Sequence, residues 1–92
     1  MIRSLRHRGL RLLYERGDDS RLHAAHRGKI ARVLGYLDVA RAPRDMDYPG
    51  LRLHPLTGDL AGFWSVTVSA NWRIIFRFDG EDIFDVDLVD YH

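Results

Sequence analysis

The hydrophobic period of the chain changes near Leu51, and this change restricts the possible fold more than any other feature. Before Leu51, apolar residues recur at intervals of three and four, which predicts two amphipathic helices. After it, they recur at every second residue, which predicts half-buried strands. Helices followed by strands with short turns favour an α+β fold, in which two N-terminal helices pack on one face of a twisted antiparallel sheet.

The N-terminal half is predicted to hold a short strand and the two helices. The strand covers about residues 2–5, and the first helix covers about residues 7–16 with Gly17 as its left-handed C-terminal residue. The Asp-Asp-Ser segment at 18–20 carries cap oxygens for the second helix, which continues to about residue 40 before Pro43 stops it.

Four strands are predicted in the C-terminal half, which completes a β-α-α-β-β-β-β order. They cover residues 51–54, 63–69, 72–78 and 84–88, and an Asp-Gly pair at 79–80 is a hairpin signal. Alternation directs one set of side chains toward the helices: Trp64, Val66, Val68, Trp72, Ile74, Phe76, Phe78, Phe84, Val86 and Leu88.

Length and composition limit the classes of protein to consider. The chain has 92 residues, so we expect one domain that covers residues 1–92. It has no cysteine, which excludes disulfides, thiolate metal sites and cysteine nucleophiles, and this fits a cytoplasmic protein. Its apolar runs are far shorter than the ~20 residues that span a bilayer, so we expect no membrane partner.

The formal charge of +1 conceals two halves of opposite sign. Residues 1–45 carry eleven Arg and Lys against five acids, whereas residues 46–92 carry three Arg against eight acids. The basic half suggests an anionic partner, although a solvated helix face explains the same charges.

The open face of the sheet carries the candidate chemistry. Alternation places Arg52, His54, Arg73 and Arg77 on it. Two imidazoles beside an arginine would suit proton transfer next to a phosphate, because histidine has a pKa of about 6.5 and arginine stabilises an oxyanion. Cleavage of RNA by its own 2′-hydroxyl needs these three groups. Exposed histidines are usually only solvated, so the pattern alone leaves both readings open.

Several motifs in order resemble the HigB group of RelE/ParE-superfamily toxins, the plasmid maintenance killer proteins of type II toxin–antitoxin systems. The central motif is LRLHPLTGDLAGFWSVTVSANWRIIFRF, and the chain begins with IRSLRHRGLRLLYERG and ends with DVDLVDYH. The resemblance covers essentially the whole chain and is weakest across the second helix and residues 40–50. It implies the RelE-like α+β fold, with the same order of helices and strands.

The resemblance also implies an activity and its partners. Toxins of this group are ribosome-dependent endoribonucleases that cleave messenger RNA in the A site. A cognate helix-turn-helix antitoxin of the HigA type neutralises them, and no metal or other cofactor is needed. By resemblance, His54, Arg73 and His92 are the catalytic residues, and Asp90 and Tyr91 belong to the functional C-terminal segment.

One position departs from the family pattern, which usually has lysine in the LHPL-GD turn where this chain has Thr57. A charge-assisted hydrogen bond contributes about 1.5–3 kcal/mol against roughly 1 for a neutral one. The lost difference corresponds to about one decade in rate. We hypothesise that Arg52, on the same side as His54, partly supplies that charge. The residues expected to contact RNA are Arg52, Thr57, Arg77, Asp90 and Tyr91.

The roles of the histidines follow from their surroundings. The C-terminal carboxylate favours the protonated form of His92, so we expect His92 as general acid and His54 as general base. Because unbroken alternation would point His92 at the helices, we expect the alternation to lapse around Asp90. His23 and His26 could share a metal ion, but a solvated or capping role is favoured.

Two alternatives remain open on the same scaffold. A toxin that resembles the ParE group would poison gyrase without cutting RNA, and it would not need paired imidazoles. A catalytically weakened paralogue would retain only antitoxin binding, and Thr57 is compatible with that.

Overall fold

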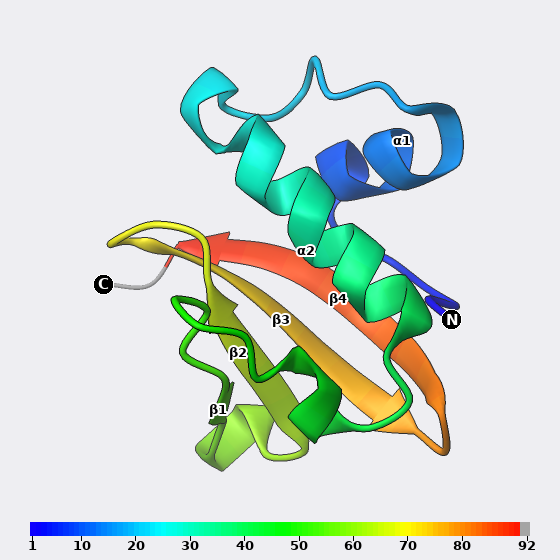
Figure 1. Cartoon of the computed structure of the whole chain (residues 1–92), viewed down its shortest axis with the longest axis vertical. Coiled ribbons are helices and arrows are strands. Elements are labelled where there is room, and N and C mark those ends of the chain that lie inside the picture. The colour runs from blue at the N-terminus through cyan, green and yellow to red at the C-terminus, as the bar shows by residue number, and fades with distance from the viewer. Residues whose placement is uncertain (91–92) are drawn as a thin grey trace.

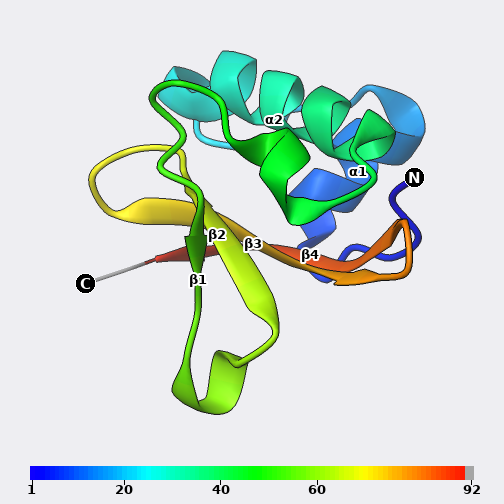
Figure 2. The same ribbon diagram turned by 60° about the horizontal axis from the view of Figure 1, so that its bottom comes forward.

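The computed structural model of the chain describes residues 1–90, and it places two helices on one face of a twisted four-stranded sheet (Figures 1 and 2). The helices and 3-10 turns are α1 (Arg8–Arg16), η1 (Ala24–His26), α2 (Arg27–Val39), η2 (Pro43–Met46) and η3 (Gly58–Leu60). The strands are β1 (His54–Pro55), β2 (Phe63–Thr67), β3 (Trp72–Asp79) and β4 (Asp82–Asp90). Neighbouring strands pair antiparallel in chain order, which confirms the predicted α+β class.

Helix α1 begins and ends as the sequence predicts. His7 precedes it, and the Nδ1 atom of His7 accepts hydrogen bonds from the amides of Gly9 and Leu10, at 3.0 and 3.3 Å. Gly17 closes the helix with φ 69°, a left-handed conformation that glycine adopts without a steric penalty. Both ends are therefore local properties of the sequence.

Helix α2 begins later than predicted. The carboxylate of Asp18 accepts from the amide of Ser20 in a local turn, and it caps no helix. His23 instead caps η1 through a hydrogen bond from the amide of Ala25, and α2 starts at Arg27. The prediction of a cap at 18–20 is wrong, because a short polar side chain stabilises a turn as readily as a helix start.

The core lies between the helices and the sheet. The sheet contributes Val66, Ile74 and Phe76, all completely buried, and α2 covers them with other fully buried side chains: Ile30, Val33 and Leu37. Each such side chain contributes about 1.5–3 kcal/mol of apolar burial. The helix side of the sheet is therefore fully used in stabilising the fold.

A bulge in β4 shifts the predicted alternation. Asp85 has φ 57°, and the pairing with β3 shifts between Ile75 and Arg77. Phe84 consequently lies opposite Arg77 on the open face, whereas Ile83 is completely buried in the core. The prediction that Phe84 faces the helices is wrong, because a bulge adds one residue and reverses the faces on one side of it.

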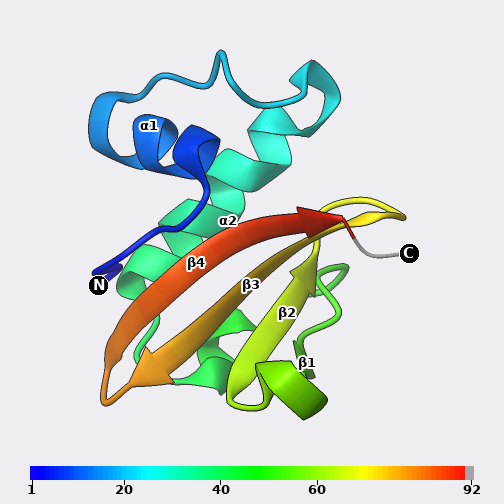
Figure 3. The same ribbon diagram turned by 180° about the vertical axis from the view of Figure 1, so that it is seen from behind.

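The N-terminal segment lies along the outer edge of β4 (Figure 3). Ile2 and Leu5 form isolated parallel bridges with Ile83 and Val86. The predicted first strand is thus present only as two bridges, and it is parallel to its neighbour. Along the described part of the chain, no helix has the length and apolar character needed to cross a bilayer.

Candidate functional site

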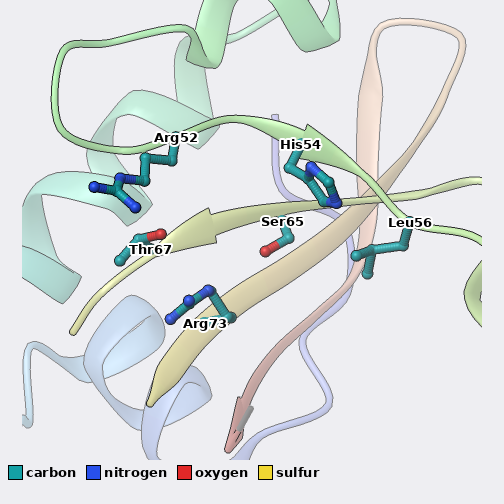
Figure 4. Close-up of a pocket in the computed structure, with 6 residues that line it drawn as sticks. All are labelled: Arg52, His54, Leu56, Ser65, Thr67 and Arg73. Atoms are coloured by element: carbon teal, nitrogen blue, oxygen red, sulfur yellow. The ribbon is translucent and has the colours of Figure 1, made fainter. Parts of the chain in front are cut away.

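The open face of the sheet contains a hollow of about 250 Å³ (Figure 4), which we call the catalytic hollow because two of the residues predicted to be catalytic, His54 and Arg73, line it. Its lining joins three residues predicted for the site with three others: Arg52, His54, Leu56, Ser65, Thr67 and Arg73. The volume lies below the roughly 300–1,000 Å³ of pockets that enclose small ligands. Its shape suits a segment of a larger molecule that lies across the sheet.

Strand register brings the polar side chains together. His54 lies opposite Ser65 across β1 and β2, and Thr67 lies opposite Arg73 across β2 and β3. Directly opposite residues in an antiparallel pair share a face, with Cβ atoms about 4.5–5.5 Å apart. The imidazole and the guanidinium therefore come from different strands of one rigid sheet.

Arg52 reaches the hollow through an irregular backbone. It has φ 53°, so the strand predicted over 51–54 is broken there, and β1 comprises only His54 and Pro55. The left-handed region costs a non-glycine residue about 1–2 kcal/mol. A hydrogen bond from the amide of Thr67 to the carbonyl of Leu51 (2.7 Å) holds this segment in place. Residues in sparsely populated conformations concentrate at functional sites, where the surroundings hold them.

Arg73 is positioned by the loop between β2 and β3. Its Nη1 atom donates to the carbonyl of Ser69 at 2.7 Å and to the carbonyls of Ala70 and Trp72 at 3.2 Å each. Backbone carbonyls orient the guanidinium without neutralising its charge. Such a group is suited to stabilising an anion, because its planar donors are fixed before the ligand arrives.

Arg77 lies on the same face but outside the lining of the catalytic hollow. Its Nε atom donates to Asp85 at 2.7 Å, and its guanidinium lies 5.1 Å from the centre of the Phe84 ring. Arg6 approaches the other oxygen of Asp85 at 3.4 Å. The hydrogen bond from Arg77, followed by the charge of Arg6, holds the pKa of Asp85 below its usual range. The predicted contact of Arg77 with RNA stays a prediction.

The remaining predicted residues lie around or beyond the hollow. Thr57 is exposed at the start of η3 and does not line it. Asp90 ends β4 opposite Trp72, and the preceding residue, Val89, pairs with Arg73. Beyond the bulge, the pairing of β4 with β3 is regular from Asp87 to Asp90, so no lapse occurs before the end of the described residues. Tyr91 and His92 lie outside the described residues.

Sequence reasoning did not single out the hydroxyl groups of the hollow. Ser65 is only 5% exposed, and Thr67 lies between strands β1 and β3 at the end of β2. Because side chains alternate along β2, both residues are expected on the face opposite to that of Trp64 and Val66. That pattern was sufficient to find them.

The histidines of the helical region have a structural role. His23 caps η1, which agrees with the favoured capping role, and the centroid of its ring lies 5.0 Å from that of His26 with the ring planes tilted by 32°. Within residues 1–90, no group of three or more His, Asp or Glu side chains is arranged to hold a metal ion.

Known proteins are similar to this chain in sequence and in fold. Residues 3–92 match the family described as RelE-like toxin of type II toxin-antitoxin system HigB. The Endoribonuclease HigB of Proteus vulgaris is 41% identical over the full length of both chains. Among solved structures, YafQ from Escherichia coli strain BL21(DE3) has a TM-score of 0.65 at 15% identity, covering 98% of this chain and 91% of YafQ. The YoeB/ParE toxin from Agrobacterium tumefaciens has a TM-score of 0.56 at 26% identity, covering 78% and 79%. The similarity to YafQ concerns the fold alone. The family match and the full-length relative show that the chain belongs to the HigB-like, RelE-like toxins of type II toxin–antitoxin systems.

Proposed function

We propose that this toxin is an endoribonuclease that cleaves messenger RNA in the ribosomal A site. The observation that carries the proposal is the catalytic hollow, which gathers the imidazole of His54 with the guanidinium groups of Arg52 and Arg73. The Proteus vulgaris relative, named as an endoribonuclease and 41% identical over its full length, supports the same activity.

The proposed reaction is an attack of the ribose 2′-hydroxyl on the adjacent phosphorus. His54 accepts the proton of the hydroxyl as general base, and Arg73 stabilises the charge on the phosphorane oxygens. The bond from phosphorus to the 5′-oxygen then breaks, and His92 donates a proton to that oxygen. The products are a 2′,3′-cyclic phosphate and a 5′-hydroxyl, so all atoms balance without a cofactor.

Arg52 is proposed to contact a phosphate beside the one that is cut. It lines the catalytic hollow with His54, whereas Thr57, at the position of the family lysine, is exposed outside the lining. This arrangement supports the hypothesis that Arg52 supplies the charge that Thr57 lacks. Arg77, Asp90 and Tyr91 complete the proposed RNA contacts at the edges of the site.

The partners follow from the class of the toxin and from its charge. A toxin of a type II system has an antitoxin partner. We propose a HigA-like antitoxin with a helix-turn-helix, and a cytoplasmic toxin that docks on ribosomal RNA through its arginine-rich N-terminal half. Such docking weakens as salt rises, because each phosphate contact releases counterions.

Primer extension on ribosome-bound message tests the proposal directly. We expect new 5′ ends within the A-site codon with the wild-type toxin, and none with His92→Ala. Intact message together with stalled replication would show ParE-like action on gyrase instead. Intact message and normal replication, with antitoxin binding retained, would show a weakened paralogue.

A further inference from the structure

A second hollow, of about 320 Å³, lies between α2 and the segment that follows η2, and the mechanism above does not use it. Figure 2 shows this segment running beside α2 before it turns into β1. Two tyrosines and two basic residues give the hollow its chemistry: Tyr36, Tyr48, Lys29 and Arg32. We refer to it as the tyrosine hollow.

The two tyrosine rings form a flat aromatic platform. The centroids of Tyr36 and Tyr48 are 4.0 Å apart, and the ring planes differ by 15°. Tyr36 comes from α2 and is half-buried, whereas 37% of Tyr48 is exposed to solvent. An exposed aromatic ring with a rigid ring behind it is a surface on which another planar group can stack.

The backbone fixes the position of the outer ring. The amide of Leu51 donates to the carbonyl of Tyr48 at 3.1 Å, which closes a turn through Pro49 and Gly50. Gly50 has φ 86°, as the third residue of a type II turn requires, and proline suits the second position. The backbone that carries the ring of Tyr48 is therefore already ordered, and it loses little conformational entropy when a ligand binds.

The charge beside this platform is positive, and it has no acidic partner among the described residues. Lys29 and Arg32 are one turn apart on α2, and neither makes an ion pair with any residue in the range 1–90. The carboxylate of Asp45, in nearby η2, accepts hydrogen bonds from the amides of Arg41 and Ala42. Positive charge next to an exposed aromatic ring matches the phosphate and the base of a single-stranded nucleic acid.

The tyrosine hollow adjoins the catalytic hollow along the chain. Leu51 lines the first and Arg52 lines the second, and consecutive Cα atoms are only about 3.8 Å apart. We infer that the tyrosine hollow is a nucleotide subsite for the substrate RNA, in which Tyr48 stacks on a base next to the cleavage position and Lys29 and Arg32 contact the backbone phosphates. This inference rests on the proposed RNA cleavage and adds the means by which the strand is held.

The test measures binding of a short, mixed-sequence single-stranded RNA in which every 2′-hydroxyl is methylated, so that no cleavage occurs. Stacking tolerates any base, and its loss should weaken binding of Tyr48→Leu about tenfold. Tyr48→Phe keeps the ring and should bind as the wild type does. Thermal unfolding of both variants checks that the turn remains folded.

The salt dependence of binding identifies the phosphate contacts. Lys29→Ala and Arg32→Ala should each reduce the slope of log K against log salt by about 0.7, the value for one phosphate contact with a single strand. Arg41→Ala is the matched control, because Arg41 lies at the other end of α2 beside Asp38 and Asp82. It should leave the slope unchanged.

The inference would be overturned if Tyr48→Leu bound the RNA probe with wild-type affinity. It would also be overturned if Arg41→Ala lowered the salt slope as much as Lys29→Ala and Arg32→Ala do. A third contradicting result is a Tyr48→Leu variant that binds the RNA probe normally and is weakened only toward message-free ribosomes or the antitoxin. The second binding arm therefore uses ribosomes without message and purified antitoxin. The binding assay does not depend on cleavage, because the probe cannot be cut. A toxin that cuts no RNA would therefore refute the proposed nuclease, while the effect of Tyr48→Leu on binding could still be measured.

Discussion

The open face of the sheet has two halves that look alike in sequence and differ in structure. In the paired half, Arg77 donates to Asp85 at 2.7 Å and lies over Phe84. In the hollow half, Arg52 and His54 have no acidic partner within residues 1–90, and in the same range Arg73 donates hydrogen bonds to backbone carbonyls.

The difference separates two uses of a guanidinium. A carboxylate neutralises the charge of Arg77, so that this arginine stabilises the sheet. Within residues 1–90, the carbonyls of Ser69, Ala70 and Trp72 orient the guanidinium of Arg73, and a carbonyl carries no formal charge. Charged residues on one face are therefore distinguished by what they contact, and this difference supports the proposal that the hollow half binds RNA.

The largest expected effect compares the two arginines in a cleavage assay. Arg73→Ala should reduce the cleavage rate about 100- to 1,000-fold, as the loss of a transition-state donor does. Arg77→Ala should reduce it less than about tenfold, the effect of one charge-assisted contact. Rates on ribosome-bound message, at a temperature where both variants are folded, check this. Equal losses would remove the distinction between the halves.

The next largest effect concerns stability in the paired half. Asp85→Ala should lower the free energy of unfolding by about 2–3 kcal/mol, because it removes the partner of two guanidinium groups and places alanine at a positive φ. The pKa of Asp85 is depressed, so its contribution is present above about pH 3.9 and is lost as the pH falls through the lower value. Denaturant unfolding at pH 7 and pH 3 measures both. Asp87 lies on the same face and forms no ion pair with residues 1–90, so Asp87→Ala should change stability much less.

A hydrogen bond from a tyrosine to a carboxylate on the helix side shows how much such a contact stabilises the fold. The hydroxyl of Tyr14 donates to Asp38 at 2.6 Å, and burial followed by this bond raises the pKa of Tyr14 to about 12. Tyr14→Phe should cost about 1.5 kcal/mol at pH 7. The pKa of Asp38 is lowered by the same bond, so the difference should fade below about pH 4 and again as the pH rises from 10 to 12. Tyr36→Phe is the control, and an equal loss there would contradict the assignment.

The smallest effect tests whether Arg52 supplies the positive charge that the family lysine would provide at the position of Thr57. Arg52→Ala should slow cleavage about tenfold, and Thr57→Lys should restore most of that loss in the double variant. Cleavage rates of the two single variants and the double variant give the coupling. If Arg52→Ala has the wild-type rate and Thr57→Lys gains nothing, Arg52 only solvates the segment before β1.

The parts of the fold that depend on local chemistry could be predicted from the sequence. The period change, the left-handed Gly17 and the stop before Pro43 all appear where expected. The bulge at Asp85 could not be predicted, because aspartate tolerates a positive φ without any local signal. The bulge contacts the N-terminal segment, where the hydroxyl of Ser4, 81 positions away, accepts a hydrogen bond from the amide of Asp85 at 2.8 Å.

The candidate site was predictable as a face but not as a hollow. Alternation placed Arg52, His54 and Arg73 on the open face, and the structure brings them together. It could not separate Arg73 from Arg77, because that difference arises from Asp85 after the bulge and from the loop carbonyls. The positive φ of Arg52 likewise follows from tertiary contacts, since arginine carries no signal for it.

The central claim is that RNA is cut by its own 2′-hydroxyl in the catalytic hollow. The direct measurement combines His54→Ala with a message that carries a single 2′-deoxyribose at the mapped cleavage position, and it analyses the ends of the products. The account predicts a 2′,3′-cyclic phosphate and a 5′-hydroxyl from the wild-type toxin on unmodified message. It predicts no cut at the deoxy position and a loss of about 100- to 10,000-fold for His54→Ala. Cleavage at the deoxy position, or a His54→Ala variant that cuts at the wild-type rate, would contradict it.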